Sequence, residues 1–464
     1  MAQPDTIRVA TGRPPRCMPS SETHPMPTSI FAPPSNWPTI ATPDVAVIGA
    51  GPAGIGAACA AAKLGADVLL IDRMGFPGGV ASACCCPYLM GFSVGDRQVI
   101  GGVADELVRV LDSMGQARLR VAPMAVPDSG PIGDRPLLAN VITSVEGVRL
   151  AALQLLERAG ARTLFYTRLI GALTEDGRIA AAAVDCAEGP GLIRARTFVD
   201  ATGDANLVYR AGGAVREAPA DESVTKTILI RVGGVVGFDV RDISAAFKAR
   251  VDAGTVPLAA QDQFMGMALL NPGEALLNFT LTIGDGLTSA ELTRMDRELR
   301  EQVPMTVEWF RSEMPGFAEC FLVDSAVNVG VRCGRSIVGH ETITMESIDE
   351  NPPVAEPVAL GSRGYGGHGL AKFRSPWSKY GSGPRGIPWR ALLPVGLENV
   401  AVGGRGISCD HRVIDTIRLM ARCMATGQAA GVTAALAAQS NSSCISVGYD
   451  AVRDALLDQS AILA

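Results

Sequence analysis

The first clear pattern along the chain is a short apolar run, a glycine-dense turn, an alanine-rich stretch and a second apolar run. Residues 44–48 and 67–71 are continuously apolar after a leading Asp, as in strands that are buried on both faces of a parallel sheet. The alanine-rich residues 55–64 favour a helix that Gly65 ends. The pattern predicts a βαβ unit of the doubly wound α/β class.

The next segments change from a helical to a strand pattern. Apolar side chains spaced for one buried face predict a helix over residues 144–159. Three strand-like runs follow, with turn signals at Asp176-Gly177 and at residues 188–191 between them. The runs are residues 163–173, 178–185 and 192–200. They predict a β-meander, which residues 200–204 close.

The middle of the chain has no regular order of elements. Strand-like and helix-like runs alternate irregularly between residues 213 and 386, and we interpret this stretch as a mixed α+β substrate domain. The strand-like runs are 226–232, 275–282 and 326–331, and the helix-like runs are 289–302 and 305–314. The substrate domain is expected to interrupt a Rossmann-like domain made of residues 44–212 and 387–464. Its last part contains a strand at 400–402 and a helix at 426–438.

Residues 1–43 differ in composition from the rest of the chain. They are rich in Pro, Ser and Thr. Proline fixes φ and removes a backbone donor, so the stretch is expected to be a flexible extension, irregular and largely unpacked.

Composition narrows the classes of function. The 464 residues are 47% hydrophobic and 19% charged, which predicts a compact fold. A net charge of −6 without a Lys/Arg-dense run argues against nucleic-acid binding, and no apolar stretch of spanning length predicts membrane insertion. The eleven cysteines are odd in number and irregularly spaced, so we expect a reducing cytoplasmic location and no disulfide framework. They contain no C-x-x-C pair, so we expect no metal site. The sequence leaves open whether the protein forms a homo-oligomer.

The glycine-dense turn carries the main chemical motif. Residues 49–54 fit G-x-G-x-x-G between a strand and a helix. Gly49 permits the tight turn, Gly51 lets a diphosphate approach the main chain, and Gly54 lets the helix pack on the strand. Free N–H groups at the helix start favour phosphate oxygens, and Asp72 ends the second strand where a carboxylate accepts from ribose hydroxyls. The motif by itself leaves NAD and FAD open.

A second match to the same pattern, at residues 364–369, is judged accidental. No convincing strand leads into it, and Pro376 follows where a helix would have to form. We therefore expect one dinucleotide fold and no separate NAD(P)H domain.

Several stretches together resemble one flavoprotein family. Residues 45–82 (VAVIGAGPAGIGAACAAAKLGADVLLIDRMGFPGGVAS) resemble the start of the FAD-dependent oxidoreductase family of the glutathione-reductase-like, two-dinucleotide-binding-domain superfamily, and Ala-Thr-Gly-Asp at 201–204 resembles its second FAD motif. Three more stretches resemble that family: GVRCGRSIVGHETIT, IPWRALLPVGLENVAVGGRGIS and RLMARCMATGQAAGVTAALA. The resemblance covers roughly residues 44–438 and implies FAD as the cofactor.

The resemblance also implies roles for individual residues. Residues 49–54 would bind the diphosphate, Asp72 the adenosine ribose, and Leu169 the adenine. Gly427 and Gln428 would start the last helix and face the N1/C2=O edge of the flavin. The complete implied cofactor set is Gly49, Ala50, Gly51, Pro52, Ala53, Gly54, Asp72, Arg73, Gly79, Val80, Ala81, Leu169, Gly203, Asp204, Gly404, Arg405, Gly427 and Gln428.

Candidate catalytic residues are few. His411 lies between the glycine-rich turn and the last helix, and His368 lies in a glycine-rich loop, so either could move a proton near neutral pH. Arg335 could anchor a carboxylate. These three residues are candidates for the substrate site.

We expect an FAD-dependent dehydrogenase or reductase that moves a hydride between a small organic substrate and flavin N5. One alternative is a thiol–disulfide oxidoreductase that uses Cys84-Cys85-Cys86, although buried thiols more often act as small hydrophobic groups. Another is an electron-relay subunit of a larger complex. The sequence contains no motif that identifies the substrate or the electron acceptor.

Overall fold

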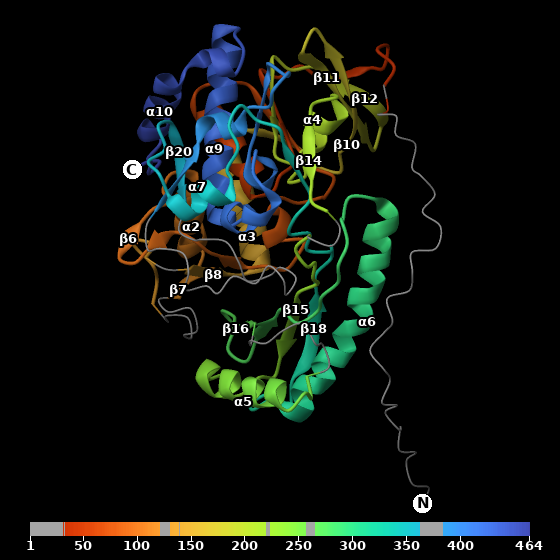
Figure 1. The fold of residues 1–464 in the computed structure, drawn as a ribbon, viewed down its shortest axis with the longest axis vertical. Helices are drawn as coiled ribbons and strands as arrows, with labels where there is room; N and C mark the ends of the chain where they lie inside the picture. The colour runs from red at the N-terminus through yellow and green to blue at the C-terminus, as the bar shows by residue number, and fades with distance from the viewer. Residues whose placement is uncertain are drawn as a thin grey trace, which may run out of the picture.

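A computed structural model gives the fold of residues 31, 33–120, 130–138, 140–219, 223–256, 265–361 and 384–464 (Figure 1). Its centre is a five-stranded parallel sheet with the strand order β22-β13-β2-β3-β9. The strands are β2 (Val45–Ile48), β3 (Val68–Ile71), β9 (Arg162–Leu164), β13 (Thr197–Asp200) and β22 (Val400–Val402). Helices α1 (Pro52–Lys63), α3 (Val145–Ala159) and α9 (Met420–Ser440) pack with this sheet in one hydrophobic core. The predicted doubly wound α/β class is confirmed.

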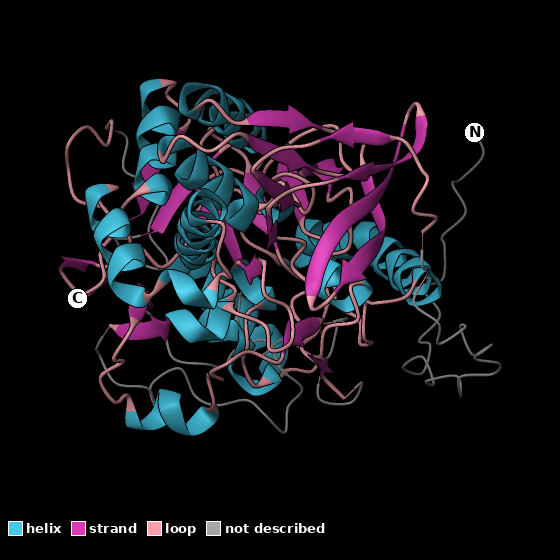
Figure 2. Ribbon diagram, turned by 90° about the horizontal axis from the view of Figure 1, so that it is seen from above, coloured by secondary structure: helices cyan, strands magenta, loops and turns pink. Residues whose placement is uncertain are grey.

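The predicted β-meander is present, with shifted boundaries. It consists of β10 (Arg168–Glu175), β11 (Arg178–Cys186) and β12 (Gly189–Ile193), and Figure 2 shows its long strands along one side of the molecule. Asp176 (φ 47°) and Gly177 (φ 74°) form the predicted hairpin turn. The prediction was wrong at residues 188–191, because β12 already begins at Gly189 and residues 194–196 separate it from β13.

The run at 163–173 is two strands and not one. Its first part, β9, belongs to the parallel sheet, and its second part begins β10 of the meander. Tyr166 has a φ of 54° between them, which breaks the extended conformation. A single apolar run therefore serves two sheets.

The end of the predicted flexible extension is ordered. Strand β1 (Thr39–Ala41) pairs in parallel with β12 and adds a fourth strand to the meander. Trp37 packs against the small apolar cluster of Ala181, Ala183 and Leu192. The prediction of an unpacked stretch was wrong for these residues, because the edge of the meander offers both backbone partners and apolar surface. Residues 1–30 lie outside the described chain.

A second hydrophobic core lies beside a smaller antiparallel sheet, in the lower part of Figure 1. The sheet contains β16 (Gly266–Ala268), β17 (Ala275–Leu277), β15 (Ile230–Gly233) and β18 (Phe321–Ser325), in that order. Helices α5 (Val240–Asp252) and α6 (Ser289–Glu313) cover it. The two helix-like runs predicted at 289–302 and 305–314 form this one helix α6, with Pro304 inside it. Residues 326–331 form no strand, only an isolated bridge between Thr227 and Gly330.

Apolar residues between Cys333 and Leu360 pack with the main hydrophobic core, which surrounds the parallel sheet. The remaining elements are β4 (Tyr88–Leu89), β5 (Ser93–Val94), β6 (Arg97–Gln98), α2 (Val103–Ser113), β7 (Ala117–Arg120), β8 (Asn140–Thr143), α4 (Asn206–Arg210), β14 (Val215–Glu217), β19 (Arg335–Ile337), α7 (Met345–Glu350), β20 (Pro357–Gly361), β21 (Arg385–Pro388), α8 (Ile414–Ile417) and α10 (Tyr449–Asp458).

Helices α1 and α9 touch through their backbones. A Cβ atom built on Gly56 would lie 2.3 Å from the carbonyl oxygen of Met424. A Cβ on Gly427 would lie 2.0 Å from the carbonyl oxygen of Ala53, and one on Gly431 would lie 2.2 Å from that of Ala57. No side chain fits between the two helices at these three positions, so glycine sets their separation.

The predicted start of the last helix was wrong. Helix α9 begins at Met420 with Leu419 as its N-cap, six residues before Thr426. Threonine is a favoured N-cap residue, but the hydroxyl of Thr426 donates to the carbonyl of Arg422 (3.1 Å) inside the helix. Gly427 and Gln428 are therefore interior residues of α9.

Replacing Gly427 with Ala should destabilise the protein, because the new methyl group meets backbone that cannot move away. We expect a loss of about 2–3 kcal/mol in the free energy of unfolding, even though alanine has the higher helix propensity. Urea unfolding followed by circular dichroism measures this loss. Gln439→Ala, on an exposed position of the same helix, should cost less than about 1 kcal/mol. Equal losses in the two variants would contradict the close helix contact.

Candidate cofactor and substrate site

The glycine-rich turn between β2 and α1 has the geometry of an anion cradle. Gly49 has a φ of 103°, and a Cβ on Gly54 would lie 1.7 Å from the carbonyl oxygen of Gly49. A Cβ on Gly51, in contrast, meets only the Cα of Gly79 at 3.9 Å, so the space in front of Gly51 is open. Helix α1 starts with Pro52, and the N–H groups of Ala53 and Gly54 lie in its first turn, without an intrahelical acceptor. The residues fit a bound diphosphate.

Asp72 lies at the end of β3, beside this turn. Its carboxylate accepts hydrogen bonds from the backbone N–H of Ala50 (2.6 Å) and of Met74 (2.8 Å). Burial raises the pKa of Asp72, although these two hydrogen bonds and the charge of Arg73 act in the opposite direction. Arg73 itself is exposed. Each carboxylate oxygen keeps a further lone pair that could accept from a ribose hydroxyl.

Leu169 lies in the first residues of β10, and the segment before it is joined to Asp72. The backbone N–H of Thr167 donates to the carbonyl of Asp72 (2.8 Å), and that of Tyr166 donates to the carbonyl of Met74 (3.1 Å). Leu169 therefore lies two residues beyond the backbone hydrogen bond that joins this segment to Asp72, and its contact with adenine stays a prediction.

Gly79, Val80 and Ala81 form a short 3-10 turn, η1 (Gly79–Ala81), directly against the cradle. A Cβ on Gly79 would lie 2.8 Å from the Cα of Gly51, so the two backbones nearly touch. Val80 is half-buried and Ala81 is buried. These predicted cofactor residues thus border the same space as Gly51.

Arg405 joins the two other predicted cofactor segments. It lies in the 3-10 turn η4 (Gly404–Gly406), and its guanidinium donates to the carbonyl of Gly203 (2.7 Å) and pairs with the carboxylate of Asp204 (2.6 Å). The same guanidinium donates to the carbonyl of Val331. Gly404 lies against α1, since its Cβ would meet that of Ala53 at 3.0 Å. Arg405 thereby fixes the 203–204 turn beside the cradle.

Gly427 and Gln428 have structural contacts. Gly427 packs on α1, and Gln428 is buried with its side-chain oxygen accepting from the backbone N–H of Val103 (3.2 Å). Its amide nitrogen lies 3.4 Å from the backbone oxygen of Gln459. The N–H groups that these residues were expected to present belong instead to the first turn of α9.

That first turn contains Met420, Ala421 and Arg422, which the sequence analysis did not identify. The helix start lies close to η4, because the backbone N–H of Gly404 donates to the hydroxyl of Thr426 (3.0 Å), one turn further along α9. The mostly helix-favouring residues from Met420 to Ala425 could have indicated the earlier start of the helix. The positive end of the helix dipole is therefore next to the predicted flavin position.

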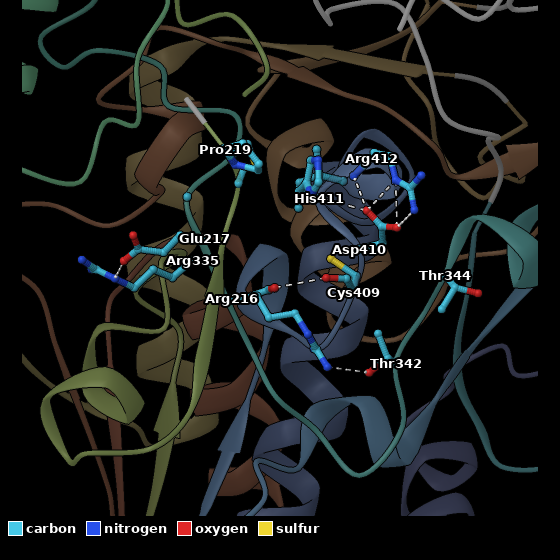
Figure 3. A pocket seen from close by; sticks show the side chains of 15 residues that line it. Arg216, Glu217, Pro219, Arg335, Thr342, Thr344, Cys409, Asp410, His411 and Arg412 are labelled. Carbon is cyan, nitrogen blue, oxygen red and sulfur yellow. Dashed lines mark hydrogen bonds and ion pairs between the residues drawn. The ribbon is translucent and has the colours of Figure 1, made fainter. Parts of the chain in front are cut away.

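His411 and Arg335 line one cavity of about 660 Å³ (Figure 3). The imidazole Nδ1 of His411 lies 3.5 Å from the carboxylate of Asp410. Burial acts to raise the pKa of Asp410, but hydrogen bonds from Arg412 hold it below its usual value, so Asp410 is ionised at neutral pH. Asp410 can thus fix the orientation of the His411 ring.

Arg335 is held in place by several partners. It pairs with Glu217 (2.8 Å), and its guanidinium lies 4.0 Å from the centre of the Tyr209 ring. Cys333 and Gly334 continue the same wall of the cavity, and a Cβ on Gly334 would lie 1.9 Å from the carboxylate of Asp204. The cavity therefore adjoins the cofactor segments at Asp204.

The third catalytic candidate, His368, and the glycine pattern at 364–369 lie outside the described residues.

The three consecutive cysteines are close to the cofactor segments. The thiol of Cys84 lies 3.7 Å from the carbonyl oxygen of Val329, and Cys85 has a φ of 48°. Burial raises the pKa of Cys84 to about 12 and that of Cys85 to about 11, and it also raises the pKa of Cys86. All ten described cysteines are free thiols. Thiols with such pKa values stay protonated at neutral pH and are poor nucleophiles.

Within the described parts of the chain, no helix is long and apolar enough to cross a membrane. No group of three His, Cys, Asp or Glu side chains in those parts is arranged to hold a metal ion.

Comparisons with known proteins identify the family of this chain. The model of the family described as "FAD dependent oxidoreductase" matches residues 44–456. Over 187 residues the chain is 29% identical to digeranylgeranylglycerophospholipid reductase 1 of Methanopyrus kandleri, a match that covers 39% of this chain and 45% of that relative. The chain thus spans less than half the length of this curated relative.

Two solved structures are similar at low identity. A geranylgeranyl bacteriochlorophyll reductase-like protein from Thermoplasma acidophilum has a TM-score of 0.47 at 15% identity, covering 91% of this chain and 84% of that chain. The flavin-dependent brominase Bmp2 has a TM-score of 0.47 at 12% identity, covering 89% and 83%. Because the family match extends over most of the chain, the protein belongs to the FAD-dependent oxidoreductase family and is an FAD enzyme.

Proposed function

We propose that this enzyme is a dehydrogenase or reductase that moves a hydride between a small organic substrate and N5 of the flavin. The contact of Gly334 with Asp204 carries the proposal, because it joins the cavity of His411 to the segment that Arg405 fixes beside the FAD cradle. FAD, when bound, supplies the hydride acceptor or donor. The chain's own residues bind, orient and exchange protons with the substrate.

The proposed cofactor contacts follow the path from Asp72 to α9. Residues 49–54 would hold the diphosphate, Asp72 the ribose and Leu169 the adenine, while Arg73, Gly79, Val80 and Ala81 border the cofactor. Gly203, Asp204, Gly404 and Arg405 would meet the ribityl chain. The N–H groups that would face the N1/C2=O edge of the flavin are those in the first turn of α9 and not those of Gly427 and Gln428. The reason is that the free N–H groups of a helix lie in its first turn.

His411 is the proposed proton donor or acceptor. Asp410 lies beside Nδ1 and can orient the ring, and His411 lines the cavity where the substrate would bind. Arg335 keeps its pair with Glu217, so it would shape the cavity wall and add positive charge to it. Membership of the glutathione-reductase-like superfamily and a cytoplasmic location belong to the same proposal, and the free thiols support the latter. The electron acceptor is left open among O₂, a quinone and a protein.

The thiol–disulfide alternative is disfavoured by the same geometry. A dithiol relay needs a thiolate near neutral pH, whereas burial raises the pKa of all three cysteines at 84–86. The electron-relay alternative does not explain a cavity that adjoins the cofactor segments.

Purified protein should be yellow and lose its blue absorbance band when dithionite or a substrate is added anaerobically. A panel of candidate substrates, with flavin bleaching as the readout, tests the proposed reaction. A colourless protein that fails to take up added FAD would contradict the proposal.

Replacing Gly51 with Ala should weaken FAD binding without harming the fold. The added methyl group enters the open space in front of the cradle, so we expect the FAD dissociation constant to rise by roughly tenfold or more. Unfolding of the apoprotein should change by less than about 0.5 kcal/mol. Gly54→Ala, whose methyl group meets the Gly49 carbonyl, should lose both FAD binding and stability. A Gly51→Ala protein with unchanged FAD affinity would place the diphosphate elsewhere.

Replacing His411 with Gln should slow flavin reduction by the bleaching substrate by about 10²–10⁴-fold, while FAD affinity stays the same. Stopped-flow absorbance under anaerobic conditions measures the rate. The variant with Ala at positions 84, 85 and 86 should keep a rate within about threefold of the wild type. The opposite pattern, with the cysteine variant inactive and His411→Gln active, would favour thiol chemistry.

A further inference from the structure

Two cations in the interior, Lys226 and Arg332, lie beside the cofactor segments without a carboxylate partner. In the part of the chain that the structure covers, neither side chain forms an ion pair. Lys226 is fully buried, and Arg332 is half-buried. An unpaired charge is costly when it is buried, as at Lys226, so a bound anion beside this pair of cations would be favourable.

Lys226 projects from a strand-like segment at the edge of the second sheet. Its backbone pairs with Thr282 in both directions (2.9 and 3.0 Å), and its ammonium group donates to the hydroxyl of Ser223. Ser223 is a neutral partner and accepts only one of the three ammonium hydrogens. Among the described residues, Ser223 is the one hydrogen-bond acceptor found for this fully buried ammonium group.

Arg332 is anchored to the same segment by neutral oxygens. Its guanidinium donates to the carbonyl of Thr225 (2.7 Å), the residue before Lys226, and to the side-chain oxygen of Asn278 (3.1 Å). These hydrogen bonds orient the planar group but leave its charge uncompensated. Arg332 and Lys226 are close enough for Arg332 to contribute to a lowered pKa of Lys226.

The neighbouring cations are already neutralised. Arg405 pairs with Asp204 (2.6 Å), and Arg418 pairs with Asp415 (2.5 Å). The charges of Asp285 and Glu291 act on Lys226, and that of Asp415 acts on Arg332, but none of these carboxylates forms an ion pair with either cation in the described part of the chain. The nearby thiols do not offset the positive charge, since burial raises the pKa of Cys84 to about 12 and also raises the pKa of Cys333.

The two cations lie where a substrate would meet the cofactor. The loop of residues 327–334 contains Arg332, and its backbone is tied to the FAD segments at three points. Asn328 N–H donates to the carbonyl of Ala83 (3.0 Å), Val329 accepts from the Cys84 thiol, and Val331 accepts from Arg405. The next residues of the loop, Cys333 and Gly334, line the cavity of His411.

We propose that the substrate or product of this enzyme is an organic acid whose carboxylate is held by Lys226 and Arg332. The inference rests on the proposed function. The cofactor would have other partners for its charge, because the N–H groups at the start of α1 would hold its phosphates and the first turn of α9 would stabilise charge on its ring. Lys226 and Arg332 are instead anchored to the second sheet through Thr225, Asn278 and Thr282, on the substrate side.

Small carboxylates and their neutral amides test the inference directly. Benzoate and succinate, with benzamide and succinamide as matched neutral probes, are titrated into oxidised holoenzyme and followed by flavin absorbance and by calorimetry. At least one carboxylate should bind about tenfold or more tightly than its amide. Lys226→Met and Arg332→Met should each weaken that carboxylate about tenfold while FAD affinity stays within about twofold.

Exposed residues provide the matched controls. Lys248→Met on α5 and Arg300→Met on α6 remove the same charges from exposed or partly exposed positions and should leave carboxylate affinity unchanged. Equal binding of each carboxylate and its amide would overturn the inference. So would variants at Lys226 and Arg332 that alter FAD affinity or the flavin reduction potential but not carboxylate binding, because the cations would then serve the cofactor.

The test separates failure of the inference from failure of the proposed function. If the protein does not take up FAD, the proposed function fails, and calorimetry on the apoprotein still compares each carboxylate with its amide. A preference for the carboxylate that disappears in Lys226→Met supports the anion site in either case. A lack of preference overturns it in either case.

The pH dependence gives a second readout. Burial lowers the pKa of Lys226 to about 8, and the charged and titratable groups around it are Cys333, Arg405, Asp285, Arg332 and Glu291. Because Lys226 loses its charge as the pH rises through about 8, carboxylate affinity should fall by on the order of tenfold between about pH 7 and 9. Burial also lowers the pKa of Arg332, to about 10, so the titration is kept below that pH. Lys226→Met should remove this dependence. An unchanged pH profile in the variant would contradict the role of Lys226.

Discussion

Backbone contact between α1 and α9 is the constraint on which the remaining arrangement depends. Gly56, Gly427 and Gly431 let the two helices approach without side chains between them. The start of α1 and the Gly403–Gly404 turn are thereby brought into contact, although about 350 residues separate them in the chain. The helix pair therefore determines where the glycine-rich turn at 49–54 and the turn at 403–404 meet, which is the place proposed for the cofactor.

Arg405 extends that arrangement toward the second sheet. Its guanidinium is bound by Gly203, Asp204 and Val331, so one side chain holds the second FAD turn and the loop that carries Arg332. The ion pair with Asp204 places a negative charge next to Arg405 and so reduces the repulsion between Arg405 and the neighbouring cations. The segments proposed to hold the cofactor and the substrate are therefore joined by one side chain. A change at Arg405 would be expected to affect both.

Local signals in the sequence were sufficient for the elements that build the cradle. The strand, turn and helix around Gly49, the hairpin at Asp176-Gly177 and the strand Val400–Val402 all follow from residue type and spacing over a few positions. Each of these features is decided by short-range geometry, such as a positive φ at glycine or a continuous apolar run. The family resemblance then supplied the identity of the cofactor, which no local pattern contains.

The errors occurred where distant contacts override local preference. Thr426 has the side chain of a helix N-cap, yet the packing of α9 on α1 and η4 extends the helix back to Met420. Residues 39–41 look unstructured in isolation and become a strand because β12 offers a free edge. The same reason explains why Lys226 and Arg332 were not recognised as a pair, since they meet only through the fold and Lys226 has no motif around it.

The electrostatics of the interior connect these observations to chemistry. Burial keeps the thiols of Cys84 and Cys333 protonated, so they contribute no negative charge beside Lys226 and Arg332. Asp204 and Asp415 pair with Arg405 and Arg418, and Asp285, whose charge also acts on Lys226, forms no ion pair with it. A bound anion, as proposed, would balance the charge of Lys226 and Arg332. Two cations held in place before the anion arrives would then both select an acidic substrate and orient it for reaction.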